Sequence, residues 1–318
     1  MDTVEKFGDP LPGSSRRPVR RPMITLSIVV VSYNARRYLR ACLESVFAPR
    51  YPWDFEVIVV DNASHDGSAE LVREEFPKVK VIEADSNTGF ARANNLGFSV
   101  ARGQYLLMLN SDTEAVGNAL VQLVDFLATH TDVGIASARL VYPDFTDQGV
   151  GRAFPTAINS IFGRRSLLSR FFPNNRYTRQ YLLSRQHHSD APFEVDWVSG
   201  AGLMFRREVL ERLGGLDERF WMYWEDADFC FRAKQEGWRV FCLPAAVVVH
   251  HEGKSSGGRR DWRLIIAFNR SAYRYYRKHH LKSRLLPQTA IAVIFLALRT
   301  GALLCANAFR TIGWQNKL

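Results

Sequence analysis

The sequence has few of the features that mark secreted, redox-active or dinucleotide-binding proteins. It holds only four cysteines, whose wide separation shows neither metal-binding nor redox spacing and is typical of reduced structural cysteines in a cytoplasmic protein. Residues 1–23 contain Arg and Pro but no apolar core, so we expect a disordered segment rather than a secretory signal peptide. No glycine triplet follows the first apolar run, which argues against a dinucleotide-dependent dehydrogenase.

Acidic residues are almost absent from two segments. Residues 148–189 contain seven arginines and no acid, and residues 254–318 contain thirteen lysines and arginines against the single acid Asp261. Because apolar residues lie among these charges, the tail predicts contact with an anionic membrane surface rather than with nucleic acid, for which it has no binding motif. A solvated charged helix, a helix packed on the main domain and a dimer contact remain open alternatives.

The tail also lacks a hydrophobic run long enough to cross a membrane. Its uncharged stretch at residues 285–298 has fourteen residues, whereas a spanning helix needs about 20. Extending the stretch to Phe309 places Arg299 near its middle, at a cost of about 2.5–3.5 kcal/mol on insertion scales. We therefore expect residues 261–318 to form basic amphipathic helices that hold the protein peripherally on the inner, cytoplasmic face of the cell membrane.

What the sequence does contain is a repeated alternation of β-branched apolar runs and amphipathic segments. Strands are predicted at residues 26–31, 55–60, 79–82 and 105–109, and helices at residues 35–47, 68–76, 91–101 and 118–130. Such alternation predicts an α/β fold, with a Rossmann-like, mostly parallel sheet flanked by helices on both faces.

The second half of the chain has a different character. Residues 148–189 have weak periodicity and predict a loop or a helical excursion. The elements predicted after it are two short strands within residues 193–206, a helix at 208–213, strands at 238–242 and 246–249, and a helix at 263–279. We expect one domain over residues 24–260, followed by the basic helical appendage.

Polar residues follow three of the predicted strands, at the positions where an open parallel sheet binds its ligands. They are Ser32, Tyr33 and Asn34 after the first strand, Asp61, Asn62, Ala63 and Ser64 after the second, and Asn110, Ser111 and Asp112 after the fourth. Any one group could serve only as a turn or cap, which is the usual role of Asn, Asp and Ser. All three at one edge of a sheet predict a single ligand-binding crevice.

A segment rich in acids and aromatics is the most informative feature of the chain. Residues 221–230 place three carboxylates within four positions, between aromatic residues and at or near the start of a predicted helix. Acids at a helix N-terminus can simply cap the helix and compensate its dipole. Acids surrounded by aromatics are, however, costly to bury unless they are paired, hydrogen-bonded or used in chemistry.

Eight short motifs share their order and spacing with one known family. They lie at residues 30–34, 59–68, 87–91, 94–97, 109–113, 214–217, 224–228 and 250–255. Together they resemble glycosyltransferase family 2, and within it the bacterial rhamnosyltransferase-like branch. The resemblance covers about residues 26–256 and implies a GT-A fold and an inverting glycosyltransferase.

The resemblance implies a divalent cation, Mg²⁺ or Mn²⁺, that stabilises the departing diphosphate of a nucleotide sugar. It places metal ligands at Asp112, in the family's acidic motif, and at His250, which follows the predicted strand at 246–249. Many members have Asp where this chain has Asn110, so Asn110 is expected to assist. His251 is an alternative ligand, and the alternative role for His250 is that of a hydrogen-bonded interior histidine.

The resemblance also implies the nucleotide-sugar contacts. Asp61 matches the position that holds the base, and a carboxylate suits the N3–H of uracil or thymine. Tyr33 could stack on that base, and Asn34 could order the loop. The other expected contacts are Ser32, Asn62, Asn87, Arg92, Asn94, Asn95, Asn110 and Ser111.

An inverting reaction needs a base that deprotonates the acceptor hydroxyl. The resemblance assigns this role to Asp226, with Glu225 orienting it or contacting the acceptor. The expected acceptor-binding residues are Trp221, Tyr223, Trp224 and Asp228. Core packing and helix capping are the alternative roles for these side chains.

The implied reaction moves L-rhamnose from dTDP-rhamnose to a hydroxyl of a lipid-linked glycan or cell-surface polysaccharide precursor. A UDP-sugar is the alternative donor. A catalytically inactive glycan-binding scaffold of the same fold is the alternative class of protein. We expect no nucleic acid partner, and the sequence leaves the oligomeric state open.

Overall fold

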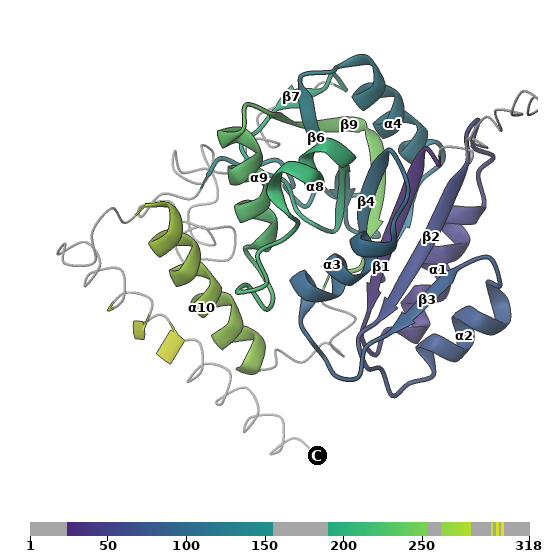
Figure 1. The fold of residues 1–318 in the computed structure, drawn as a ribbon, viewed down its shortest axis with the longest axis horizontal. Helices are drawn as coiled ribbons and strands as arrows, with labels where there is room; N and C mark the ends of the chain where they lie inside the picture. The colour runs from purple at the N-terminus through teal and green to yellow at the C-terminus, as the bar shows by residue number, and fades with distance from the viewer. Residues whose placement is uncertain are drawn as a thin grey trace, which may run out of the picture.

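The computed structural model describes residues 24–154, 190–252 and 262–280, together with Ile294, Ala297, Leu298, Thr300 and Gly301. In this part of the chain, nine strands form one mixed sheet with helices on both faces (Figure 1). The segment predicted to be disordered, most of the arginine-rich excursion and most of the uncharged stretch of the tail lie outside the described residues.

The first half of the sheet is parallel, as the sequence predicts. Its strands are β1 (Leu26–Ser32), β2 (Phe55–Asp61), β3 (Lys80–Glu83) and β4 (Tyr105–Asn110). They pair in the order β3-β2-β1-β4, and every residue of β1 is buried. A strand buried on both faces needs a continuous apolar run rather than an alternating one, and this is what the first strand has.

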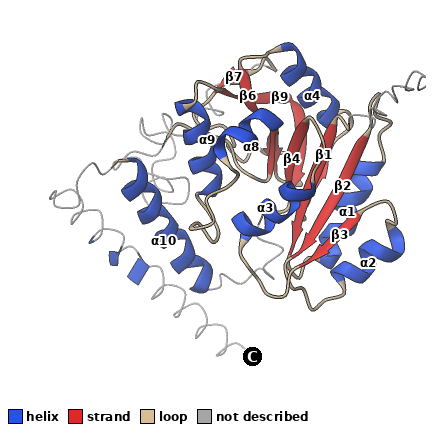
Figure 2. Ribbon diagram, viewed as in Figure 1, coloured by secondary structure: helices blue, strands red, loops and turns tan. Residues whose placement is uncertain are grey.

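The helices between these strands cover both faces of the sheet. They are α1 (Arg36–Phe47), α2 (Ser68–Glu75), α3 (Phe90–Val100) and α4 (Ala119–Thr129), all within one residue of the predicted bounds. In Figure 2, α1 passes behind β2 whereas α3 lies in front of β1. The buried face of α1 consists of Leu39, Cys42, Leu43 and Val46, the spacing of an amphipathic helix.

The second half extends the same sheet with antiparallel pairs. Its elements are β5 (Thr113–Ala115), β6 (Val133–Val141), β7 (Phe193–Glu194), β8 (Gly202–Arg206), α8 (Arg207–Leu213), α9 (Glu225–Gln235) and β9 (Arg239–His250). The strand β8 runs antiparallel to both β4 and β6, and β6 is parallel to β9. The sheet is therefore mixed, and the predicted α/β class is confirmed.

Two details of the predicted strands are wrong. The sequence analysis identified neither β5 nor β6, because β5 is very short and Gly134, Ala136, Ser137 and Ala138 give β6 little β-branched character. The two strands predicted at 238–242 and 246–249 are one strand, β9, whose register against β6 shifts after Leu243. Pro244 lies at this irregularity, where its missing N–H removes no ladder hydrogen bond.

The helix α10 (Trp262–His279) confirms the helix predicted at 263–279 and lies beside α9, away from the sheet (Figure 1). Tyr275 is its most buried aromatic and packs against Phe231 of α9, with ring centroids 6.3 Å apart. Among the described residues, no helix combines the length and the apolar character that crossing a membrane requires. The first helix of the basic appendage is thus packed against the main body of the protein.

Candidate active site

Three buried side-chain oxygens without partners lie together at the carboxyl edge of the parallel strands. Ser32 ends β1 and is paired in register with Asp61, which ends β2, while Asn110 ends β4 opposite the residue before Ser32. Ser32 Oγ, Asp61 Oδ1 and Asn110 Oδ1 have no hydrogen-bond partner among the described residues. A buried acceptor without a partner costs about 1–3 kcal/mol, so three at one edge indicate a place for a polar ligand.

The loops around Asp61 hold each other in place. The Ser64 N–H donates to Asp61 Oδ2 (2.9 Å), and Ser64 Oγ in turn accepts from the Asn34 N–H (3.0 Å). Asn34 Oδ1 accepts from the His65 N–H (2.8 Å), and its backbone has a positive φ of 51°, which Asn tolerates better than most residues. Asn34 thus orders the loop, while the neighbouring Tyr33 is 43% exposed and open to a flat ligand.

Asn62 and Asn87 use their amides to shape the next loop. Asn62 Nδ2 donates to Asn87 Oδ1 (3.1 Å), and Asn62 Oδ1 accepts from the Thr88 N–H (2.9 Å). The loop then passes Gly89, where φ is 86° and an added Cβ would lie 2.3 Å from the carbonyl oxygen of Trp221. Only glycine fits there, so this loop and the aromatic segment are in direct contact.

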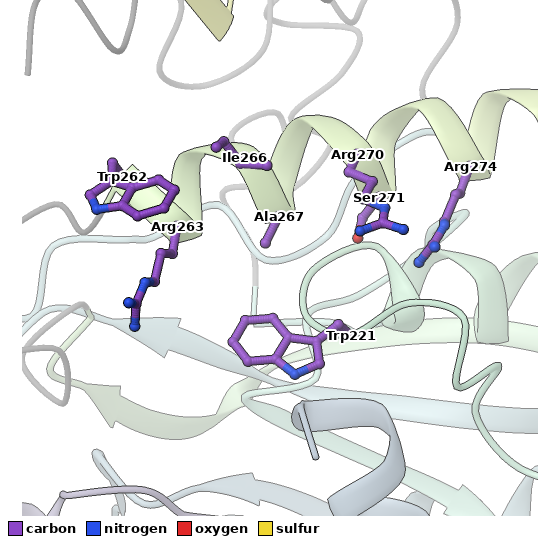
Figure 3. Close-up of a pocket in the computed structure, with 8 residues that line it drawn as sticks. All are labelled: Trp221, Trp262, Arg263, Ile266, Ala267, Arg270, Ser271 and Arg274. Atoms are coloured by element: carbon purple, nitrogen blue, oxygen red, sulfur yellow. The ribbon is translucent and has the colours of Figure 1, made fainter. Parts of the chain in front are cut away.

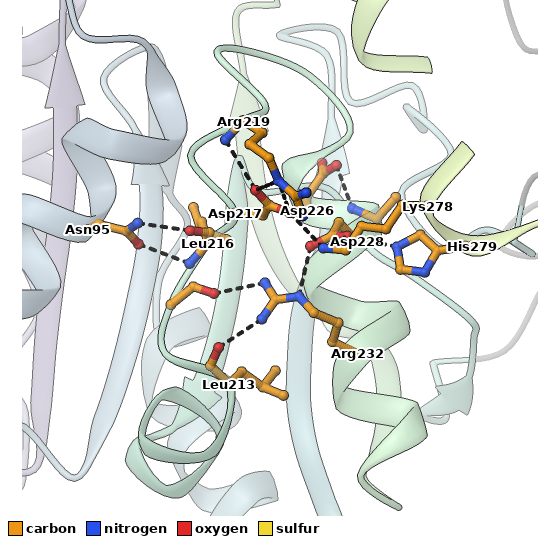
Figure 4. Close-up of polar contacts among 12 residues, drawn as sticks. Asn95, Leu213, Leu216, Asp217, Arg219, Asp226, Asp228, Arg232, Lys278 and His279 are labelled. Carbon is orange, nitrogen blue, oxygen red and sulfur yellow. Dashed lines mark hydrogen bonds and ion pairs between the residues drawn. The ribbon is translucent and has the colours of Figure 1, made fainter. Parts of the chain in front are cut away.

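The three polar residues predicted on α3 divide into two groups. Asn94 is buried, and its Nδ2 donates to the carbonyl one turn earlier (2.9 Å). Asn95 forms two hydrogen bonds of 2.9 Å with the backbone of Leu216, as Figure 4 shows. Both amides therefore bind the protein itself, whereas the side chain of Arg92 is 61% exposed.

Asp112 and His250 face each other across the end of β9. His250 Nε2 lies 3.4 Å from Asp112 Oδ1, and both residues are buried. His250 Nδ1 lies 2.9 Å from Gln148 Oε1, while Gln148 Nε2 donates to the His250 carbonyl oxygen (2.7 Å). This second bond fixes the amide orientation, so Nδ1 donates to Gln148 and Nε2 is the nitrogen that faces Asp112. His251 instead contacts Glu114, at 2.7 Å.

The donor atoms of Asp112 and His250 suit a divalent cation. A carboxylate and a neutral imidazole are suitable ligands, and Gln148 supplies the outer hydrogen bond that metal-binding histidines usually make. No group of three or more His, Cys, Asp or Glu residues is assembled in the described ranges. Within these ranges the site offers two ligands. Gln148 was not predicted, because it lies in the segment whose sequence has weak periodicity.

Glu225 and Asp226 begin α9 at the aromatic segment. Tyr223 and Trp224 both have positive φ, 69° and 73°, which turns the chain sharply into the helix. Asp226 Oδ2 accepts from the Gly200 N–H (3.1 Å), and Oδ1 accepts from the Ala227 N–H of the same helix (2.8 Å). Glu225 is buried, and its Oε2 has no partner among the described residues.

The two carboxyls differ in how well the protein stabilises their charge. Burial raises the pKa of Asp226, but backbone N–H donors, first that of Gly200, and the charge of Arg152 oppose this rise. Burial, and then the neighbouring Asp226 charge, raise the pKa of Glu225 well above its usual range. Asp226 therefore holds the negative charge of the pair and Glu225 the proton. Gly200 and Arg152 were not singled out from the sequence.

Asp228 has a different environment from its two neighbours. It is 0% exposed and pairs with Arg232 (2.8 Å), Lys278 (2.6 Å) and His279 (2.7 Å), as Figure 4 shows. Burial alone would raise its pKa, but the hydrogen bond from His279 and the charges of Arg232 and Lys278 hold the pKa below its usual range. The expected acceptor contact is thus enclosed by Arg232 of α9 and by Lys278 and His279 of α10.

The aromatic side chains expected at the acceptor also divide into two groups. The rings of Tyr223 and Trp224 lie 5.5 and 5.6 Å from that of Phe268 on α10, so packing occupies one side of each ring. Trp221 is 38% exposed and lines a cavity under α10. Tyr223 is nearly as exposed, at 36%, so the cavity rather than exposure distinguishes Trp221.

Most of this chain matches known proteins in sequence and in fold. A family model described as glycosyl transferase family 2 matches residues 27–214. N-acetylglucosaminyl-diphospho-decaprenol L-rhamnosyltransferase of Mycobacterium tuberculosis is 28% identical over 267 residues, which cover 80% of this chain and 85% of that relative. The O-antigen biosynthesis protein RfbC of Myxococcus xanthus is 30% identical over 248 residues, 76% of this chain but 18% of that longer protein.

Solved structures of glycosyltransferases share the fold. The mannosyltransferase PcManGT from Pyrobaculum calidifontis, in complex with GDP-Man and Mn²⁺, has a TM-score of 0.57 at 23% identity, covering 92% of this chain and 74% of its own. S. aureus TarS in complex with UDP-GlcNAc has a TM-score of 0.53 at 16% identity, covering 85% and 69%. These neighbours are GT-A glycosyltransferases, so the predicted GT-A fold is confirmed.

Proposed function

Because the chain belongs to glycosyl transferase family 2, we propose that it is an inverting glycosyltransferase that moves L-rhamnose from dTDP-rhamnose to a lipid-linked glycan. The name of the mycobacterial relative supports both the sugar and a diphosphate-linked lipid acceptor. The observation that carries the proposal is the set of three buried oxygens that have no partner among the described residues and that lie at one edge of the sheet. The pair Asp112–His250 lies where β4 and β9 end.

A short turn before β8 links the edge of the sheet to Asp226. Ala201 O accepts from the Asn110 N–H (3.3 Å), and the adjacent Gly200 N–H donates to Asp226 Oδ2 (3.1 Å). The proposed base is therefore connected by two hydrogen bonds to the end of β4, where the nucleotide diphosphate would lie. This arrangement supports transfer between a donor on the sheet and an acceptor on the aromatic segment.

Asp61 supports a thymidine or uridine nucleotide. Its Oδ1 is buried and lacks a partner, so it accepts from the N3–H of thymine or uracil, while Oδ2 stays bound to the loop. Exposed Tyr33 offers a stacking face next to it. A UDP-sugar satisfies the same contacts, and it is the second candidate donor for this reason.

Asp112 and His250 would hold Mg²⁺ or Mn²⁺, which would neutralise charge on the departing nucleoside diphosphate. The diphosphate oxygens would supply the remaining ligands, because the described residues offer two. His250 is kept in the required tautomer by Gln148.

Asp226 acts as the base. The acceptor hydroxyl gives its proton to Asp226 as its oxygen bonds to the anomeric carbon, and the bond from that carbon to the diphosphate oxygen breaks on the opposite face. The raised pKa of Asp226 makes it a better proton acceptor than an exposed aspartate. Asp228 is assigned a structural role, because ion pairs enclose its carboxylate.

The basic appendage supports work at the anionic inner face of the cell membrane, and we propose peripheral attachment there without a nucleic acid partner.

The test of the function is a donor screen. Nucleotide sugars are ranked by protection against thermal unfolding with and without Mg²⁺ or Mn²⁺, and the best donor is then assayed for transfer. The proposal predicts dTDP-rhamnose first and cation-dependent protection. Binding without transfer to any lipid-linked acceptor would instead favour an inactive glycan-binding scaffold.

A further inference from the structure

A cavity lies between α10 and the aromatic segment, and none of the expected nucleotide contacts lines it. It encloses about 260 Å³ and is lined by Trp221, Trp262, Arg263, Ile266, Ala267, Arg270, Ser271 and Arg274. Figure 3 shows the arginine side chains reaching from α10 to the side on which Trp221 lies. These α10 residues follow a helical spacing of three, four and seven positions, so one face of the helix carries both the cations and the apolar side chains.

Two of these arginines make no direct ion pair with a described residue. Arg270 and Arg274 form no hydrogen bond or ion pair within the described part of the chain, and they are one helical turn apart. Burial, and then the charge of Arg270, lower the pKa of Arg274 below its usual range, while the more distant charge of Asp217 opposes this shift without forming an ion pair. Lys278, one turn further along the same helix, is by contrast paired with Asp217 (2.7 Å) and Asp228 (2.6 Å).

The end and the middle of α10 therefore differ in how their positive charges are paired. The end of the helix is bound to the main body by acids, whereas the middle holds two like charges close together beside a cavity. Like charges at this spacing destabilise a helix unless an anion lies between them. Guanidinium groups bind phosphate oxygens in pairs, so two arginines one turn apart suit the charge of a diphosphate.

The cavity also has an apolar part and a direct connection to the proposed base. Trp262 and Ile266 are 53% and 38% exposed, which is unusual for large apolar side chains beside a cavity. The carbonyl oxygen of Trp221 accepts from the Phe90 N–H (2.7 Å), and the Phe90 ring neighbours Gly200, whose N–H binds Asp226. The wall of the cavity is therefore connected through Phe90 and Gly200 to the proposed base.

We propose that this cavity binds the diphosphate of a lipid-linked acceptor, with Arg270 and Arg274 on the phosphates and with Trp262 and Ile266 along the first part of the lipid chain. This proposal rests on the proposed function for the identity of the acceptor. It does not depend on that function for the binding of an alkyl diphosphate. The sugar at the other end of the diphosphate then reaches the base past Trp221.

The test compares a double variant, which carries both Arg270→Gln and Arg274→Gln, with the single variant Arg277→Gln. Arg277 is exposed on the same helix and does not line the cavity, so its loss changes surface charge alone. The first readout is quenching of tryptophan fluorescence by decyl diphosphate in the absence of membranes, because Trp221 and Trp262 line the site. The second is the KM for a short-chain sugar-diphosphate acceptor, with the KM for the donor as the folding control.

We expect the double variant to bind decyl diphosphate at least tenfold more weakly and to raise the acceptor KM by a similar factor, with Arg277→Gln and the donor KM unchanged. Wild-type protein should bind decyl diphosphate more tightly than decyl phosphate, which carries the single phosphate of a bulk lipid. The proposal would be overturned if both variants lost decyl diphosphate binding to the same extent. It would also be overturned if the double variant bound decyl diphosphate normally and lost only its binding to anionic vesicles. If the wild type transfers no sugar but binds decyl diphosphate through these arginines, the site stands and the proposed function fails.

Discussion

Asp226→Asn removes the proposed base while keeping the size and planarity of the side chain. General-base catalysis typically contributes about 10²–10⁴-fold in rate, and we expect kcat to fall by this factor. The amide can still accept one of the two N–H bonds that the carboxylate accepts from Gly200 and from α9. Losing the other costs about 0.5–1.5 kcal/mol, and removing a buried charge next to Glu225 offsets this loss. The free energy of unfolding should therefore change by no more than about 1 kcal/mol.

The pH dependence of the wild type provides a second measure of the same group. Because the pKa of Asp226 is raised, protonation inactivates the base at a less acidic pH than for an ordinary aspartate. The value of kcat/KM should fall as pH falls through that raised pKa, and Asp226→Asn should lack this acid limb. The raised pKa also means that the folded state binds its proton more tightly, so this group's contribution to stability declines as pH rises.

The assay measures kcat at saturating acceptor together with donor binding by thermal shift. Glu225→Gln is the matched control, because Glu225 is already protonated in our assignment and a neutral amide replaces a neutral acid. We expect it to retain activity within about tenfold, well inside the range for a lost base. Near-normal turnover by Asp226→Asn would refute the reasoning, and a complete loss only in Glu225→Gln would exchange the two roles.

Three further predictions concern the metal pair, the ion-pair network and the tail. Asp112→Ala should abolish cation-dependent donor protection, and Gln148→Leu should weaken it by about 10–100-fold, as outer-sphere substitutions do; full activity in excess EDTA would contradict both. Asp228→Asn should lower the free energy of unfolding by about 3–5 kcal/mol in urea titrations. It should also remove the loss of stability at acidic pH that the lowered pKa of Asp228 implies. An unchanged urea midpoint would argue against a structural role. Removing residues 285–318 should shift the protein from the membrane to the soluble fraction, and unchanged membrane recovery of the truncated protein would show that other residues hold it there.

The sequence predicts the parallel half of the fold well because burial alone determines it. Strands such as β1 and β2 are covered on both faces, so their apolar runs mark them without knowledge of their partners. The strand β6 depends on neighbours far away in sequence, and its small residues fit because they pack between β8 and β9. Composition carries little information about such a strand, since what stabilises it is its tertiary context.

In the candidate site, too, the sequence predicts local features but not contacts between distant residues. The position of Asp61, Asn110 and Asp112 after strands is a local property, and the structure places them at one edge of the sheet. The contact of Gln148 with His250 spans about a hundred residues and has no local signal. The same holds for Asn95, whose amide resembles a ligand contact in the sequence but binds the backbone of Leu216. Polar residues near a site cannot be divided into ligand contacts and structural contacts until their partners are known.

The spacing of Asp226 and Asp228 explains why the appendage belongs to the catalytic architecture we propose. Two positions along a helix turn by about 200°, so one carboxylate faces Gly200 while the other faces away from it. The second carboxylate is held by Lys278 and His279 of α10, which fixes the rotation of α9 about its axis. Because Asp226 is carried by the same turn of helix, docking of α10 also sets the direction of the proposed base. The helix that lines the arginine cavity therefore positions the residue that would act on whatever that cavity binds.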